Sequence, residues 1–224
     1  GSRIVVPREA KDVVTRELYD YPYITTSKKV SNSRPLDIIF LSNGEACADS
    51  NYENLQEILK GTPNKLVRVD GVNGRVQAYH AAAEASNTPW MFTVFAKLKV
   101  SNKFDWNWQL DRLQLPKHYV FHAKNPLNGL NYGHQAMIAY NKKMALANTG
   151  RGLDFTQDDE HEVLDINSGV ATFNIDEWTT WRTAFRECIK LRIYNDDISQ
   201  QRLKIWRTIA EGDFAQYCLD GAND

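Results

Sequence analysis

The chain has 224 residues, 42% of them hydrophobic and 25% charged, and a formal net charge of −1. This length suits one large α/β domain or two small ones, and we expect one because no Pro-, Ser- or Gly-rich linker divides the middle. The near-neutral charge argues against a wide basic surface for nucleic acid, although it permits a local basic groove. No apolar run approaches the ~20 residues of a membrane span.

Three cysteines, Cys47, Cys188 and Cys218, lie far apart in the sequence. An odd number of widely spaced cysteines argues against a disulfide framework or a zinc knuckle. It is typical of a reducing compartment, so we expect a cytoplasmic protein. Gly1-Ser2 resembles a cloning remnant and no initiator Met follows it, which suggests an excised piece of a larger protein.

The composition along the chain predicts three parts. Residues 1–35 form a mixed N-terminal extension, in which Pro22 ends any preceding helix. Residues 36–195 form an α/β domain. Residues 196–224 form a helical segment that packs on this domain.

Three short apolar runs organise the predicted α/β domain, over residues 36–42, 66–70 and 90–96. They are rich in β-branched and aromatic residues, as buried strands are. Residues 52–60 and 72–86, between these runs, carry apolar side chains at helical spacing. Alternating strands and helices predict a Rossmann-like sheet with parallel strands, which binds ligands at the carboxyl ends of those strands.

The second half of the chain predicts fewer regular elements. Strands are expected over residues 118–123 and 136–140, a short helix over 141–147, and loops with short strands over 151–175.

The C-terminal quarter predicts helices. Trp178, Trp181, Phe185 and Ile189 recur at helical spacing, so we expect a helix over about 176–194 with these four side chains on one core-facing stripe. Ser199 is a candidate N-cap of a second helix.

Polar residues follow the first two predicted strands. Asp70 can accept a hydrogen bond from a uracil or guanine N–H, and Asn43 and Glu45 can reach a ribose or base from the neighbouring loop. Arg75, on the first turn of the next helix, can contact a pyrophosphate. Alternatively, Asp70-Gly71 and Asn73-Gly74 are only turn residues.

Residues 36–195 resemble the nucleotide-sugar-dependent glycosyltransferases of the GT-A type. Residues 69–100, VDGVNGRVQAYHAAAEASNTPWMFTVFAKLKV, are similar to the segment in which an Asn/Gly-rich turn opens an Ala-rich helix that leads to a strand. FAKLKV, KHYVFHAKNPLNGLNYGH and WRTAFRECIKL are similar to glycosyltransferases of phages and large DNA viruses. The resemblance implies a mixed sheet with flanking helices and a UDP- or GDP-sugar as donor.

The sequence departs from this family where the family holds its metal. An Asp-x-Asp motif after the third strand would bind a divalent cation through oxygen ligands, but the matching residues are Phe95-Ala96-Lys97-Leu98. Lys97 can supply positive charge to the diphosphate in place of a metal. It can equally be a solvated lysine at a strand end, in a protein that has lost donor binding or catalysis.

Three residues in the second half are candidates for the catalytic chemistry. His134 can bind a sugar hydroxyl or act as a base, although a lone histidine is commonly structural. The resemblance implies a carboxylate base ahead of a helix, for which Glu162 and Asp176 are candidates. Asp176 alternatively caps the helix that follows it.

Arg182 and Arg186 are four residues apart and share a helix face. This spacing suits either two phosphate contacts or ion pairs with carboxylates on a neighbouring element.

The sequence therefore supports three functions. The first is transfer of a sugar from a nucleoside diphosphate to an unidentified acceptor, with no metal requirement if Lys97 replaces the metal. The second is an inactive transferase-like module that binds glycan or protein. The third is a viral transferase that glycosylates DNA bases, which only the resemblance favours and the near-neutral charge opposes.

Overall fold

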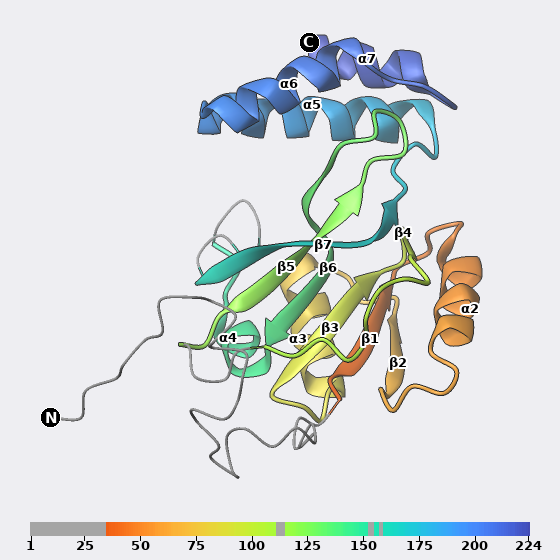
Figure 1. The fold of residues 1–224 in the computed structure, drawn as a ribbon, viewed down its shortest axis with the longest axis vertical. Helices are drawn as coiled ribbons and strands as arrows, with labels where there is room; N and C mark the ends of the chain where they lie inside the picture. The colour runs from red at the N-terminus through yellow and green to blue at the C-terminus, as the bar shows by residue number, and fades with distance from the viewer. Residues whose placement is uncertain (1–34, 111–114, 152–154, 157–158) are drawn as a thin grey trace, which may run out of the picture. The chain divides into compact units, whose positions relative to one another are not determined.

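The computed structural model describes residues 35–110, 115–151, 155–156 and 159–224, so all but the last residue of the predicted N-terminal extension lies outside the described residues. Strands and helices alternate over the first half of the described chain (Figure 1). The strands are β1 (Asp37–Ser42), β2 (Leu66–Asp70), β3 (Trp90–Phe95), β4 (Leu98–Val100), β5 (His118–Lys124), β6 (Asn131–Asn141) and β7 (His161–Ala171). The helices are α2 (Ala48–Ile58), α3 (Arg75–Ala85), α4 (Lys142–Ala147), α5 (Glu177–Tyr194), α6 (Asp197–Thr208) and α7 (Ala215–Asn223).

The seven strands form one mixed sheet in the order β2-β1-β3-β6-β5-β7-β4. β1 runs parallel to both β2 and β3, as the alternation of strands and helices predicted. β6 is antiparallel to β3 and β5, and β7 is parallel to β5. The predicted fold class, a mixed α/β sheet with flanking helices and a helical C-terminal quarter, is confirmed.

The second half of the chain is more regular than its sequence predicted. β6 begins five residues before the predicted strand, and β7 occupies eleven residues where short strands and loops were expected. Exposed and half-buried side chains alternate along the first part of β7. Such a strand carries few of the contiguous apolar residues by which buried strands are recognised.

Apolar side chains fill both faces of the sheet. Phe92 and Phe121 pack with Trp106 from the segment that follows β4. On the opposite face, Tyr79 of α3 stacks on Phe155, with ring centroids 4.1 Å apart.

A third cluster joins the three C-terminal helices to the turn between β5 and β6. Leu127, at this turn, is only 3% exposed and packs among residues of α5, α6 and α7. Asn125 shapes the turn because its side-chain oxygen accepts a hydrogen bond from the Leu127 N–H at 2.8 Å. The N–H of Glu211 donates to the Leu127 carbonyl, also at 2.8 Å. The turn thereby attaches the helices to the sheet.

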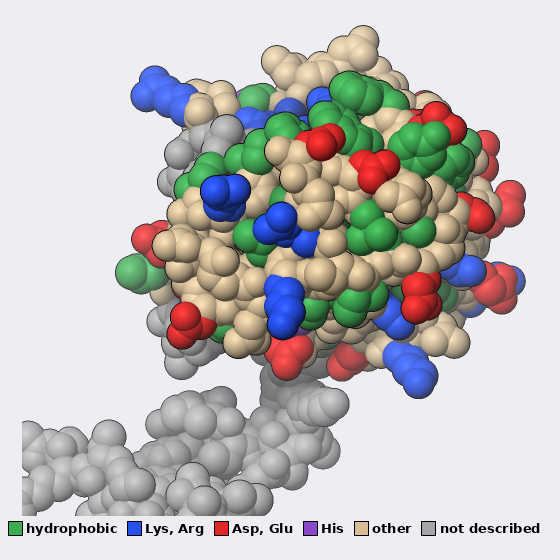
Figure 2. All heavy atoms as spheres, turned by 90° about the horizontal axis from the view of Figure 1, so that it is seen from above, with side chains coloured by type: hydrophobic (Ala, Val, Ile, Leu, Met, Phe, Trp, Pro, Cys, Tyr) green, Lys and Arg blue, Asp and Glu red, His purple; other side chains and the backbone are tan. Residues whose placement is uncertain are grey.

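The buried face of α5 is not the predicted stripe. Its buried residues are Thr180, Ala184, Cys188 and Leu191. Trp178 is instead 64% exposed and Ile189 43% exposed. Trp178, Trp181 and Phe185 stack on one another along the helix, and hydrophobic side chains are visible among charged ones from the side of the C-terminal helices (Figure 2). Small residues face the core because α7 approaches closely: a Cβ on Gly221 would lie 2.2 Å from the Trp181 carbonyl oxygen.

Candidate functional site: a basic cleft between the sheet and helix α5

The carboxyl ends of the parallel strands lie side by side. Ser42 pairs with Asp70, and Leu41 pairs with Phe95. The N–H of Ala96 donates to the Leu41 carbonyl at 2.8 Å, which holds the end of β3 against the end of β1. Asn43 follows Ser42 directly in the chain, and Lys97 follows Ala96. The tertiary fold therefore brings the ends of three strands to one edge, as the strand pattern predicted.

Polar interactions among neighbouring residues occupy the side chains at the β1 and β2 ends. The Ser42 hydroxyl donates to the Asp70 carboxylate, and the Arg68 guanidinium lies 3.6 Å from the same carboxylate oxygen. The Glu45 carboxylate accepts from the Asn43 N–H at 2.7 Å. These bonds keep the ends of the strands in shape, and Asn43 itself is exposed.

Arg75 lies at the start of α3, as predicted, but its guanidinium contacts a different loop. It donates to the Gly150 carbonyl at 3.3 Å. A Cβ on Gly150 would lie 2.3 Å from a methyl of Val76, so the loop after α4 packs directly on this helix end. A role of Arg75 in binding pyrophosphate stays a prediction.

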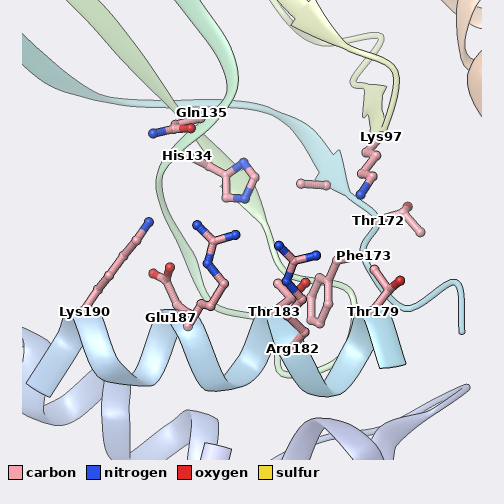
Figure 3. A pocket seen from close by; sticks show the side chains of 12 residues that line it. Lys97, His134, Gln135, Thr172, Phe173, Thr179, Arg182, Thr183, Glu187 and Lys190 are labelled. Carbon is pink, nitrogen blue, oxygen red and sulfur yellow. The ribbon is translucent and has the colours of Figure 1, made fainter. Parts of the chain in front are cut away.

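A basic cleft of about 390 Å³ lies between the end of the sheet and α5 (Figure 3). This volume is within the range of small-molecule sites. Four of its side chains are cationic at neutral pH. The lining residues are Lys97, His134, Gln135, Ala171, Thr172, Phe173, Thr179, Arg182, Thr183, Arg186, Glu187 and Lys190.

Lys97 enters this cleft from the turn between β3 and β4. Its backbone is fixed because the N–H of Thr172, just after β7, donates to the Lys97 carbonyl at 2.9 Å. Its ammonium extends toward the space above α5 (Figure 3).

Helix α5 supplies most of the remaining positive charge. Arg182, Arg186 and Lys190 recur every four residues and therefore share one face of the helix. Within the described residues, no carboxylate forms an ion pair with Arg182 or Arg186. The ion pairs with a neighbouring element, which were the alternative to phosphate contacts, are therefore not formed there. Their guanidinium groups are available to an anion in the cleft.

Asp176 caps the start of α5. Its carboxylate accepts bonds from the N–H and the hydroxyl of Thr179, each at 2.7 Å. The bond from the Thr179 N–H makes the largest contribution to lowering the pKa of Asp176, and the bond from the Thr179 hydroxyl makes the next largest. The positive charge of Lys97 also lowers this pKa. The capping alternative therefore describes what Asp176 does in this structure, while its role as a base stays a prediction.

His134 projects from β6 into the cleft (Figure 3). Its Nδ1 accepts a hydrogen bond from the Ala136 N–H at 3.0 Å. Because a backbone N–H can only donate, the neutral ring carries its proton on Nε2. In this form His134 donates a hydrogen bond and does not accept a proton at Nε2, which suits the predicted contact with a hydroxyl better than the role of a base.

Glu187 is the one carboxylate among the described residues that line the cleft. It accepts a hydrogen bond from the Tyr132 hydroxyl at 2.7 Å, and Tyr132 accepts one from the indole N–H of Trp206 at 3.2 Å. Burial is the main reason why the pKa of Tyr132 is raised well above its usual value, and the charge of Glu187 is the next. The phenol therefore keeps its proton and remains a hydrogen-bond donor. No pattern in the sequence singled out Glu187, whose only signal was its place beside Arg186.

Glu162 lies outside this cleft. It is the second residue of β7, whereas Ala171, the last residue of the strand, lines the cleft. Nine strand residues span roughly 30 Å. The Glu162 carboxylate forms an ion pair with Lys117 at 2.6 Å. The fold thus separates Glu162 from Lys97, His134 and Asp176, which it gathers around α5.

Neither a metal-binding cluster nor a membrane-spanning helix is found within the described residues. No group of three or more His, Cys, Asp or Glu side chains is arranged to hold a metal ion there. None of the helices among them is long and apolar enough to cross a membrane.

Comparison with known proteins adds a weak structural likeness. No family model and no curated protein matches the sequence. One similar solved structure is 4-diphosphocytidyl-2C-methyl-D-erythritol synthase from Anaerococcus prevotii, with 12% identity and a TM-score of 0.39 over 62% of this chain and 94% of that one. Another is HddC from Yersinia pseudotuberculosis, with 8% identity and a TM-score of 0.39 over 60% and 91%. Likeness at this level identifies neither a family nor an activity.

Proposed function

We propose that this chain is a transferase that moves a sugar from a nucleoside diphosphate donor, and that the basic cleft binds the donor's diphosphate. The observation that carries the proposal is the meeting of Lys97 with Arg182 and Arg186 in one cleft. Lys97 lies about 85 residues before Arg182 in the sequence, and both arginines lie on α5. Their convergence at the carboxyl edge of parallel strands matches the usual location of ligand sites in α/β sheets.

The charges suit the chemistry of sugar transfer. When the bond between the sugar and the diphosphate breaks, negative charge develops on the departing phosphate oxygen. Preorganised cations stabilise this charge in the transition state more than in the ground state, which lowers the barrier. Arginine is well suited to the task because its planar guanidinium forms two parallel hydrogen bonds with phosphate oxygens. Lys97, Arg182 and Arg186 would then perform the charge neutralisation that a divalent cation performs in metal-dependent transferases.

In this proposal the nucleoside lies along the ends of the neighbouring strands. Asn43 follows β1, whose end is bonded to the end of β3 just before Lys97. A diphosphate near Lys97 would therefore direct its nucleoside toward Asn43 and Asp70. In this arrangement the free oxygen of the Asp70 carboxylate would accept a base N–H, with a UDP- or GDP-sugar as donor.

Calorimetric titration with UDP, GDP, UDP-glucose and GDP-mannose tests this assignment. A charged hydrogen bond contributes about 1.5–3 kcal/mol, so Lys97→Met and Arg182→Gln should each weaken UDP or GDP binding by roughly 10- to 100-fold. Two matched variants serve as controls, Lys99→Met on β4 and Arg192→Gln on α5, because neither side chain lines the cleft. Both controls should bind like the wild type.

Two outcomes would contradict the proposal. One is the absence of heat with every nucleotide sugar, with or without manganese. The other is binding that Lys97→Met and Arg182→Gln leave unchanged.

The rival function is an inactive transferase-like module that binds glycan or protein and does not turn over a donor. The observation in its favour is that Lys97 stands where the resemblance places the metal-binding carboxylates. Release of free sugar from UDP-glucose or GDP-mannose, followed over hours, separates the two functions. Binding that responds to the cleft variants without any sugar release would favour the module.

A further inference from the structure

A second cavity of about 330 Å³ adjoins the basic cleft. Four residues line both spaces: His134, Gln135, Glu187 and Lys190. Lys97 lines only the first of the two spaces. Tyr132, Val163, Tyr194 and Arg202 line the second cavity and not the first.

The second cavity combines two cations with apolar surface. The guanidinium of Arg202 lies 4.5 Å from the centroid of the Tyr132 ring, which holds it in place by a cation–π contact. Within the described residues, no carboxylate forms an ion pair with Arg202. Tyr194 and Val163 supply exposed apolar surface, with exposed fractions of 60% and 52%. A small molecule with an anionic group on a carbon skeleton fits this set of side chains.

Glu187 stands between the two spaces. In Figure 3 its carboxylate projects from α5 toward His134 and Gln135, between Lys190 on one side and Arg182 on the other. The bond from the Tyr132 hydroxyl holds one carboxylate oxygen and leaves the second for a ligand. Glu187 is also the one carboxylate among the described residues that line the second cavity.

We propose that the second cavity binds the acceptor, that this acceptor carries a phosphate or carboxylate group beside the reacting hydroxyl, and that Glu187 takes the proton of that hydroxyl. The inference rests on the proposed function of the basic cleft. Arg202 and Lys190 bind the anionic group of the acceptor. His134 donates a hydrogen bond from Nε2 to a hydroxyl at the boundary.

The reaction is a direct displacement that balances without a further reactant. The hydroxyl oxygen of the acceptor forms a bond to the anomeric carbon of the donor sugar. The bond from that carbon to the phosphate oxygen breaks, and its electron pair leaves with the nucleoside diphosphate. The hydroxyl proton passes to the free carboxylate oxygen of Glu187.

Titration with two anionic sugars and one neutral sugar tests the acceptor class. Glucose 6-phosphate, glucuronate and glucose are titrated into protein saturated with UDP. Both anionic sugars should bind at least tenfold more tightly than glucose, and Arg202→Gln should remove this preference. Arg207→Gln, on the same helix, is the matched control because its guanidinium is bonded to Asn223 on α7 instead.

A second variant tests the proton acceptor. Glu187→Gln keeps an oxygen for Tyr132 but cannot take a proton. It should lower sugar transfer from the donor by 10²- to 10⁴-fold, the usual contribution of general-base catalysis. The affinities for UDP and glucose 6-phosphate should be retained or increase, because the substitution removes a negative charge that lines both spaces.

The outcomes separate this inference from the proposed function. No preference for the anionic sugars, or an Arg202→Gln variant that behaves like Arg207→Gln, overturns the acceptor class. Turnover that Glu187→Gln leaves unchanged overturns the role of Glu187. Failure of UDP to bind overturns the proposed function instead, while glucose 6-phosphate titrated without UDP still tests whether the second cavity binds anions.

Discussion

At the scale of single residues, the cleft gathers groups whose roles the sequence left open. Asp176 was a candidate base or a helix cap, and its two bonds to Thr179 make it a cap. Its carboxylate is still near enough to Lys97 for the lysine charge to lower its pKa. A pair of substitutions separates these roles, because asparagine caps helices as well as aspartate does but cannot act as a base.

Asp176→Ala should lower the melting temperature, because the N–H of Thr179 loses its acceptor. Asp176→Asn should leave the melting temperature nearly unchanged. If Asp176 serves only as a cap, Asp176→Asn also retains the rate of sugar release from the donor. Thermal unfolding and the donor assay on the same preparations provide the two measurements. A large loss of rate in a fully stable Asp176→Asn variant would show that the carboxylate has a catalytic role as well.

At the scale of elements, the turn between β5 and β6 determines where the basic face of α5 lies. Leu127 packs against α5 and also holds Glu211, just after α6, through its carbonyl. Arg182 and Arg186 lie on a different face of the same helix from Ala184 and Cys188, which pack in this cluster. Burial of the small residues therefore directs the arginines toward Lys97.

Leu127→Ala should reduce the free energy of unfolding by about 2–5 kcal/mol, because it removes a buried side chain and leaves a cavity. The same substitution at Leu115, which is 85% exposed, should change stability by less than about 0.5 kcal/mol. Urea unfolding followed by circular dichroism measures both. Equal effects at the two positions would argue against the packing of this turn among the helices.

At the scale of the whole molecule, a buried histidine links the sheet to the segment after α4. His118 is fully buried, and its Nδ1 accepts a hydrogen bond from the Asn141 N–H at 3.0 Å. Its Nε2 lies 3.2 Å from the Asp159 carboxylate, which also accepts from the Asn148 side chain. Burial lowers the pKa of His118 below 6.5, although the bond with Asp159 acts in the opposite direction.

This shift predicts how stability depends on pH. The unfolded chain binds a proton at His118 as the pH falls through about 6.5, whereas the folded protein resists it, so the unfolded state binds more protons. The contribution of His118 is therefore complete above pH 6.5 and is lost as the pH falls below that value. The pKa values of Asp176 and Asp196 are lowered from 3.8, so these groups act only in more acidic solution.

The free energy of unfolding should fall between pH 7.5 and pH 5.5 in the wild type, and fall less in His118→Asn. Asparagine can keep the bond from the Asn141 N–H but does not titrate. The variant should be less stable at pH 7.5, because it loses the contact with Asp159. Urea titrations at the two pH values provide the comparison. A pH dependence that His118→Asn leaves intact would assign it to other groups.

Local patterns in the sequence by themselves determined the strands β1 to β3, the helices between them and the polar residues at the strand ends. The physical reason is that burial on a strand or a helix imposes a short period of apolar residues, and that period can be read without knowing what the element packs against. The place of Lys97 at the end of β3 followed from the same pattern.

Only the tertiary structure decided which residues surround Lys97. The periodicity of α5 predicted an aromatic stripe as its buried face, but close packing of α7 selected a face of small residues for the core and left Trp178 and Ile189 exposed. The same packing turned Arg182 and Arg186 toward Lys97 and brought Glu187 to Tyr132, 55 residues earlier in the chain. Contacts between such distant residues depend on how whole elements fit together, and no local period in the sequence encodes that fit.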